Sequence, residues 1–221
     1  MTLDDLILEV TNIIQDSAFN EETIETYLNE ALVRIAAGVQ VPGELHITAP
    51  LPDLYTEGTL DLVDTARVIS LPTDYQRDLF NIYSSTGNNE IPVFESLHKF
   101  LNRYPVLETG SNVEACVVRG TSLIYHPAAT ETITFAYYKT PTTMTSGTDE
   151  PEGIPAHLQR RLLIGYVCRE IFNRIEDGIE GQKVNTNFYD AEFFEGVVEL
   201  DRYLGDDGLP EFVTDDTDYI L

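Results

Sequence analysis

Basic residues are scarce in this chain, and the scarcity argues against one class of function. Lys and Arg together make up 13 of 221 residues, against 38 Asp or Glu, for a formal net charge of -25. Proteins that hold duplex DNA need lysines and arginines against the phosphates, so a DNA-binding surface is not expected. The charge favours solubility, and it also suits a surface past which nucleic acid moves without sticking.

Cysteines are equally few. Cys116 and Cys168 lie in unrelated apolar contexts, outside any C-x-x-C pair or Cys/His cluster, so neither a disulfide framework nor a zinc site is expected. We predict two buried packing residues. The histidines fall on four different predicted elements without a second ligand at metal-binding spacing, which predicts no metal and no cofactor. They are His46, His98, His126 and His157.

Long apolar runs and catalytic motifs are missing too. No run approaches the ~20 residues that span a bilayer, and the acidic start, MTLDDLILEV, does not resemble a signal peptide. We therefore expect a protein made in the cytoplasm, without a membrane segment. Nucleophile-elbow, P-loop, dinucleotide-binding and zinc-protease patterns do not occur. Two carboxylates suited to glycoside hydrolysis can always be found among 38 acids, so a hydrolase stays only as an alternative.

The N-terminal region is typical of two paired helices. Thr2 is a candidate N-cap with Asp5 three residues later, and apolar residues then recur at helical spacing up to Ile14. Asn20 is the candidate cap of a second helix, which Gly38 ends. The two segments predict a helical hairpin over residues 1–38.

From residue 39 the pattern changes to short β-like runs between Pro and Gly residues, which predicts a β-rich insert over residues 39–153. The run VEACVVRGTSLIYHP indicates a hairpin that turns near Gly120, and ETITFAYYKTP a half-buried strand. ELHIT, TLDLV, RVISLP and DLFNIYSS are further strand-like runs, and a short helix is expected around Phe94–Arg103. Residues 140–155 resemble a linker in composition.

Helix is predicted again from Pro155, with one apolar row through Leu163, Val167 and Ile171 and a second row beside it. A last helix ends at Gly205. The prediction is thus an α+β fold in which residues 1–38 and 154–204 build a helical bundle. An acidic arm, residues 205–221, should be flexible until a partner binds it, through Phe212, Val213, Tyr219, Ile220 and Leu221.

Four of the 13 basic residues lie on the helix after Pro155. They are Arg160, Arg161, Arg169 and Arg174. Such a concentration in an acidic chain suggests contacts with an acidic partner or a neighbouring copy. Salt bridges within the chain are the equal alternative, since exposed ion pairs carry little energy.

Three stretches, after an N-terminal helical pair, resemble the head-to-tail adaptor proteins of tailed bacteriophages. They are LPTDYQRDLFNIYSSTGNNEIPVFESLHKFLNRYP, VRGTSLIYHPAATETITFAYYKTPTTMT and DEPEGIPAHLQRRLLIGYVCREIFNRIEDG. The resemblance extends from the first helix to about Leu204 and rests on element order and turn chemistry. No catalytic signature contributes to it.

The resemblance implies a structural virion protein at the head–tail junction, not an enzyme. Such proteins form a ring, twelve-fold to match the portal, extend the DNA channel and offer a docking surface to tail or nozzle proteins. DNA passes the channel without specific binding, and the C-terminal arm reaches the portal protein. The alternatives are a tail-completion or tail-terminator ring protein and a virion-associated peptidoglycan hydrolase, onto which no catalytic residue of this sequence can be carried.

Overall fold

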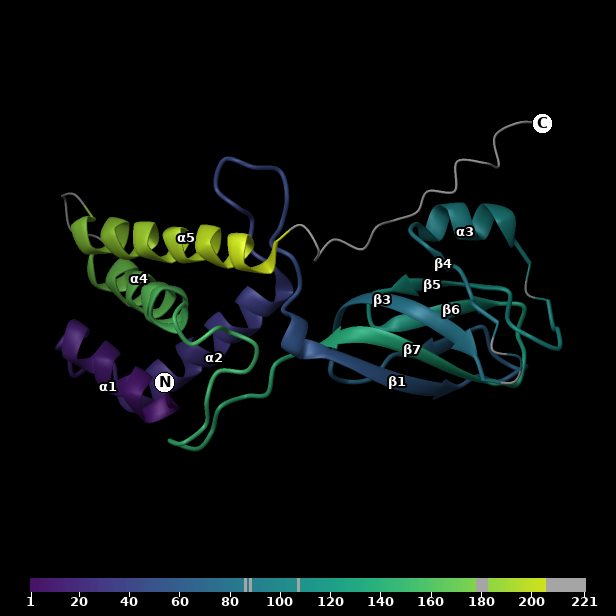
Figure 1. The fold of residues 1–221 in the computed structure, drawn as a ribbon, viewed down its shortest axis with the longest axis horizontal. Helices are drawn as coiled ribbons and strands as arrows, with labels where there is room; N and C mark the ends of the chain where they lie inside the picture. Colours follow the sequence, from purple (N-terminus) through teal and green to yellow (C-terminus); the bar gives the residue numbers. More distant parts are fainter. Residues whose placement is uncertain (86, 88, 107, 178–182, 206–221) are drawn as a thin grey trace. The chain divides into compact units, whose positions relative to one another are not determined.

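The computed structural model describes residues 1–85, 87, 89–106, 108–177 and 183–205 (Figure 1). They form two compact units: Met1–Leu51 with the chain from Thr142 onward, and Pro52–Pro141. The first unit is helical and the second is built on β-sheets. The predicted α+β fold, with N- and C-terminal helices packed together and a β-rich region inserted between them, is confirmed.

The helical hairpin consists of α1 (Leu3–Ile14) and α2 (Glu21–Ala37). Both start where capping chemistry predicts. The Thr2 hydroxyl accepts a hydrogen bond from the Asp5 amide at 3.3 Å, and the Asp5 carboxylate accepts one from the Thr2 amide at 3.0 Å. The Asn20 side chain accepts from the Thr23 amide at 3.0 Å. Each cap satisfies amides that have no partner inside the helix.

The C-terminal helices are α4 (Gly165–Ile175) and α5 (Val184–Leu204), and a π-helical turn, η2 (Arg160–Ile164), leads into α4. Helix was expected from Pro155, but the chain first makes a tight turn, in which the Leu158 amide donates to the Pro155 carbonyl. In Figure 1, α4 lies between α5 and the α1–α2 pair, and it contacts all three helices. The predicted row Leu163, Val167 and Ile171 is fully buried there.

The segments that flank the helices, residues 39–51 and 142–153, belong to the helical unit. The expected boundaries at 38/39 and 153/154 therefore differ from those of the compact units. Leu51 and Met144 are buried, and the Asn29 side chain both donates to and accepts from the Met144 backbone, at 3.0 and 2.8 Å. The Leu3 amide donates to the Asp149 carbonyl at 2.8 Å. Linker-like composition did not reveal these contacts, because backbone groups make most of them.

The β unit contains two sheets. The first is antiparallel in the order β1-β7-β3, from β1 (Tyr55–Asp61), β7 (Thr132–Lys139) and β3 (Tyr75–Ser84). The second has the order β2-β6-β5-β4, from β2 (Val68–Ser70), β6 (Ser122–His126), β5 (Ala115–Arg119) and β4 (Val93–Phe94). A 3-10 turn, η1 (Pro52–Leu54), precedes β1, and α3 (Leu97–Arg103) follows β4.

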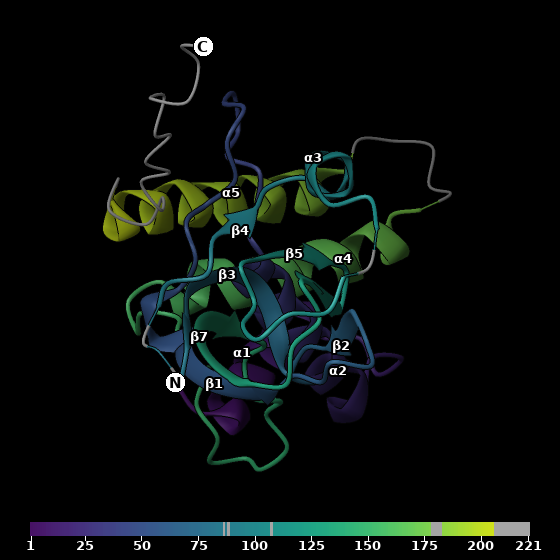
Figure 2. The same cartoon turned by 90° about the vertical axis from the view of Figure 1, so that its right-hand side faces the viewer.

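The β unit has three layers, because side chains alternate between the faces of each strand. Phe135 and Tyr137 of β7 pack between the sheets, against Tyr125 of β6. The opposite face of the second sheet, with Val117, packs on Phe100 of α3. Figures 1 and 2 show α3 beyond β4 and β5, on the side away from β1 and β7. The outer face of the first sheet is thus the face of the β unit that neither core covers.

Several local predictions are confirmed and others are wrong. β5 and β6 form the expected hairpin, and Gly120 at its turn has a φ of +58°, which glycine adopts without strain. ELHIT is not a strand, since residues 44–48 form part of a loop with one isolated bridge, Gln40 to Ile47. The expected short helix is present as α3, where Phe100 is fully buried and Leu97 packs against the same core while Leu101 is exposed.

Candidate interaction surfaces

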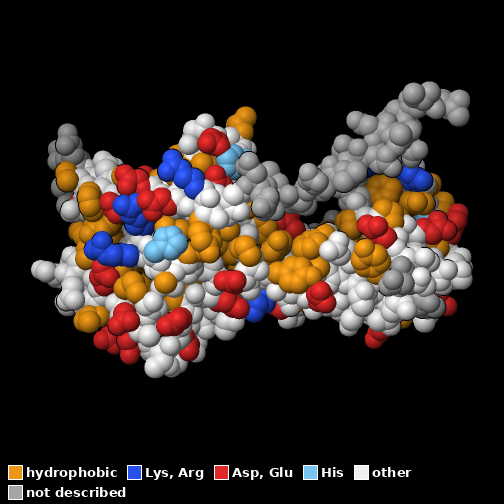
Figure 3. Space-filling model, in the orientation of Figure 1, with side chains coloured by type: hydrophobic (Ala, Val, Ile, Leu, Met, Phe, Trp, Pro, Cys, Tyr) orange, Lys and Arg blue, Asp and Glu red, His pale blue; other side chains and the backbone are white. Residues whose placement is uncertain are grey.

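Arg160 and Arg161 both engage carboxylates of their own chain. Arg160 Nε lies 2.5 Å from Glu9 of α1, while its side chain stays 68% exposed. Arg161 lies within 4.0 Å of three glutamates of α5, and its shortest contact, 2.5 Å, is with Glu199. On the face shown in Figure 3, basic and acidic side chains of the helical unit lie intermixed. The alternative of internal salt bridges therefore describes these two arginines.

Arg169 and Arg174 lie on α4 and use aromatic rings as well as charge. Arg169 pairs with Glu170 at 2.7 Å and with Asp190 at 3.3 Å, and its guanidinium lies 4.8 Å from the centre of the Tyr166 ring. It is 13% exposed, so it acts inside the bundle. Arg174 is exposed, lies 5.0 Å from the Tyr27 ring, and forms no ion pair with a described residue. Arg160 and Arg174 are therefore the two most accessible of the four.

The predicted partner-binding residues of the C-terminal arm lie outside the described residues. They are Phe212, Val213, Tyr219, Ile220 and Leu221. Their role, and the flexibility expected for the arm, stay predictions.

A loop between α2 and the β unit, residues 39–48, presents an apolar side chain that sequence reasoning missed. At its base the Thr48 amide donates to the Val39 carbonyl and the Val39 amide donates to the Thr48 hydroxyl, each at 3.0 Å, and Gly43 turns the loop with a φ of +79°. His46 links it to the end of α5, with Nε2 3.3 Å from the Asp201 carboxylate. Leu45 at the tip is fully exposed. Because Ile47 of the same loop is half exposed as well, the loop places two apolar side chains together in solvent and is a candidate contact for another protein.

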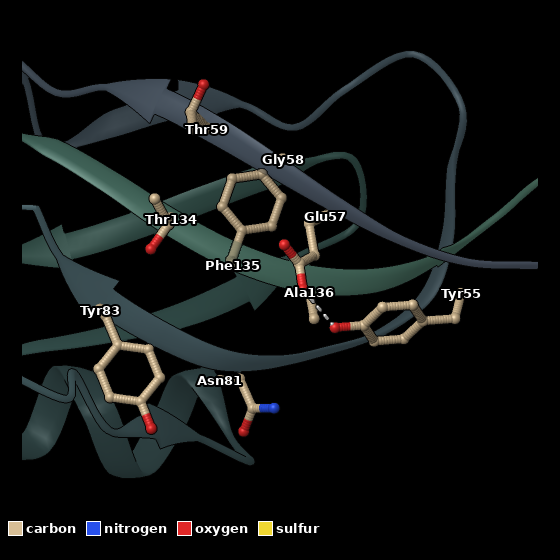
Figure 4. A pocket seen from close by; sticks show the side chains of 9 residues that line it. All are labelled: Tyr55, Glu57, Gly58, Thr59, Asn81, Tyr83, Thr134, Phe135 and Ala136. Carbon is tan, nitrogen blue, oxygen red and sulfur yellow. Dashed lines mark hydrogen bonds between the residues drawn. The ribbon is translucent and has the colours of Figure 1, made fainter.

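A second candidate is a hollow on the outer face of the β1-β7-β3 sheet, with a volume of about 400 Å³ (Figure 4). Tyr55 and Tyr83 lie on opposite sides of it, with Glu57 and Asn81 between them. Thr59 and Thr134 contribute hydroxyl groups from neighbouring strands. All these side chains come from strands of one sheet, so their positions are set by its register.

The charge of this hollow is negative. The Tyr55 hydroxyl donates to Glu57 Oε1 at 2.8 Å, and this hydrogen bond is the main cause that raises the pKa of Tyr55, with burial second. Glu57 forms no ion pair with a described residue. The strand alternation of YTEGTLD was the signal that could have placed Tyr55, Glu57 and Thr59 on one face, but it does not indicate which neighbours they meet.

Cysteine or metal chemistry finds no support in the described part of the chain. Cys116 and Cys168 are free and buried, as predicted, and burial raises the pKa of each thiol to about 12. Within the described ranges, no group of three or more His, Cys, Asp or Glu side chains is placed to hold a metal ion. None of the described helices has the length and apolarity that crossing a bilayer requires.

Comparison with known families decides the class of the protein. The family model described as SU10 adaptor protein matches residues 1–214. The chain belongs to the SU10 adaptor protein family. As a member of that family it is a phage head–tail adaptor, a structural protein that binds other virion proteins. Comparison with curated proteins finds no match.

Membership in the SU10 adaptor family confirms the resemblance seen in the sequence. It also favours the structural interpretation over the peptidoglycan hydrolase alternative. An adaptor acts by binding other proteins, and exposed residues make those contacts. The loop tip at Leu45, the hollow around Glu57 and the accessible Arg160 and Arg174 are therefore its candidate contact sites.

Proposed function

We propose that this adaptor assembles as a ring beneath the portal, extends the DNA channel and provides the attachment site for the tail. The observation that carries the proposal is the match to the adaptor family over residues 1–214. A twelve-fold ring, matched to the portal, is the copy number that we propose. The protein would then act in the virion, at the head–tail junction.

The acidic composition supports a channel role. With a net charge of -25, the chain repels a polyanion at long range. A ring of such chains would let packaged DNA slide, because few lysine or arginine side chains are available to hold its phosphates. We propose that the ring makes no sequence-specific contact with the DNA.

The C-terminal arm is the proposed portal contact. Residues 206–221 contain six acids and no bases, together with the apolar residues Phe212, Val213, Tyr219, Ile220 and Leu221. Such a segment can bind along a groove or sheet edge, where charge steers the approach and apolar side chains supply most of the affinity. Of the four arginines proposed for subunit or partner contacts, Arg160 and Arg174 suit that role best by exposure.

Truncation tests the arm. Deleting Asp218–Leu221 should leave the melting temperature nearly unchanged but abolish attachment to portal-bearing, DNA-filled heads. A full-length control with Asp215, Asp216 and Asp218 changed to Asn should still attach, more slowly, since it keeps the apolar groups. Added salt should slow the wild-type protein by screening its field. A truncated protein that joins heads at the wild-type rate would show that the docking surface lies elsewhere.

Electron microscopy of heads with the adaptor attached tests the ring itself. We expect twelve copies directly beneath the portal. Copies found at the far end of the tail tube would instead identify a tail-terminator protein, and the proposal would fail.

A further inference from the structure

The outer face of the β1-β7-β3 sheet carries a hollow lined by one acidic and several neutral polar side chains. Every ionisable or polar side chain of its lining offers an oxygen that can accept a hydrogen bond. These side chains are Tyr55, Glu57, Thr59, Asn81, Tyr83 and Thr134. The lining includes no Lys, Arg or His. The hydroxyl and amide groups can donate as well, so the charge of Glu57 sets the preference: the site suits a ligand that carries positive charge and donates hydrogen bonds.

Glu57 supplies the negative charge at the centre of this lining. Its Oε1 accepts the Tyr55 hydroxyl at 2.8 Å, which holds the carboxylate in place, and no described basic side chain neutralises it. By contrast, Arg160, Arg161 and Arg169 are already paired with glutamates or aspartates of their own chain. Glu57 is thus an acidic group still available to a partner.

β3 is deformed so that its side chains reach the hollow. Its register against β7 shifts between Arg77 and Leu79 and again between Phe80 and Tyr83. At these two irregularities Asp78 and Asn81 have φ angles of 52° and 51°, which non-glycine residues rarely adopt. Bulges re-aim side chains and are common next to binding sites. Here the second one exposes Asn81 beside the hollow (Figure 4).

Aromatic rings complete a site for a planar cation. Tyr55 and Tyr83 lie on opposite sides of the hollow (Figure 4). Tyr55 also belongs to an aromatic cluster, with ring centres 6.0 Å from Phe80 and 6.5 Å from Tyr138. Ring faces attract cations, arginine more often than lysine. A guanidinium is planar, donates five hydrogen bonds and accepts none, so it matches acceptors and rings together.

We propose that this hollow binds an arginine side chain presented by another virion protein, with Glu57 as its counter-ion. The inference rests on the proposed adaptor function, which requires such a partner. Each chain carries a net charge of -25, so a basic protein is steered toward the hollow more strongly than a second copy of this chain, whichever contacts hold the copies together in the ring. The same charge would draw a basic partner toward the site.

The test is a titration of the isotope-labelled full chain with N-acetyl-arginine N-methylamide, followed by amide NMR. We expect saturable shifts at Gly58, Asn81 and Thr134. Glu57→Gln should weaken binding by about fivefold, the effect of losing one exposed ion pair, while its side-chain oxygen can still accept the Tyr55 hydroxyl. Asp61→Asn, on the same strand but outside the lining, is the charge-matched control and should leave the affinity unchanged.

The citrulline analogue has nearly the same shape without the charge, and it should bind at least about fivefold more weakly, because it loses the same ion pair. Equal binding of both analogues, shifts elsewhere on the chain, or no shift at all would overturn the proposal. Self-association of the wild-type protein that Glu57→Gln abolishes would overturn the assignment to a different protein. Attachment to heads is measured separately. A protein that attaches to heads but does not bind the arginine probe refutes this site alone. A protein that binds the probe but does not attach to heads refutes the proposed function alone.

Discussion

A β-carbon added to Gly165 would lie 3.2 Å from the backbone nitrogen of Phe193 and 3.3 Å from its α-carbon. Glycine therefore lets α4 approach the backbone of α5 at this point. Gly196 makes the matching approach from α5, where an added β-carbon would lie 3.0 Å from Cβ of Arg161. This close crossing also brings the Arg161 guanidinium within reach of the α5 glutamates.

Gly165→Leu should therefore destabilise the helical unit. The new side chain meets the Phe193 backbone, which cannot move aside as a flexible side chain could. We expect a loss of about 2–3 kcal/mol in the free energy of unfolding, typical of overpacking, measured by urea denaturation. Ala191→Leu, at an exposed position of α5, is the control and should change stability little. Equal stability of the two variants would contradict the close crossing.

Val167→Asp should be more damaging, because Val167 is fully buried between α4 and its neighbours. An uncompensated charge in such surroundings costs about 3–5 kcal/mol, which calorimetry would record as a large fall in melting temperature. Asn173→Asp introduces the same side chain at an exposed position of α4 and should melt near the wild type. If both variants melt alike, the helix register is wrong.

The contact between Glu176 and the start of α5 should depend on pH. The Thr186 hydroxyl donates a hydrogen bond to the Glu176 carboxylate at 2.6 Å, and this bond is the main cause that lowers the pKa of Glu176. The backbone amides of Asn185 and Thr186 also donate to the same carboxylate. Because the pKa is lower in the folded state, the stabilisation is complete above the unfolded value near 4.5 and is lost as pH falls through the folded value.

Thr186→Val removes the hydroxyl, so the pKa of Glu176 should rise toward its ordinary value in a carboxyl NMR titration. The stability difference between variant and wild type should be present at neutral pH and shrink in acid. Thr26→Val, whose hydroxyl bonds to a carbonyl within α2, should leave the Glu176 titration unchanged. An unaltered Glu176 pKa in Thr186→Val would rule out the assigned cause.

The two thiols should be unreactive in the folded protein. With a pKa of about 12 for both Cys116 and Cys168, almost no thiolate exists at pH 8, and both side chains are buried. Ellman's reagent should detect no thiol in native protein and two per chain in denaturant. Rapid reaction of either cysteine without denaturant would mean that its part of the core opens readily.

Features that depend on neighbouring residues were predictable from the sequence. The Thr2–Asp5 capping box, the Asn20 cap and the turn at Gly120 each need a few adjacent residues of the right type. The buried row of Leu163, Val167 and Ile171 follows from the period of the helix. Together with the element order, these local signals were sufficient for the α+β class and the family resemblance.

Tertiary structure decided what depends on residues far apart in the chain. The sequence does not indicate that Asn29 would bind the backbone of Met144, since backbone groups carry no residue signature. It offers several acidic partners for Arg161, and the helix crossing at Gly165 selects those of α5. The hollow around Glu57 exists because β1, β7 and β3 pair in one register and β3 bulges at Asn81. Strand pairing is long-range, so only the folded sheet brings these side chains together.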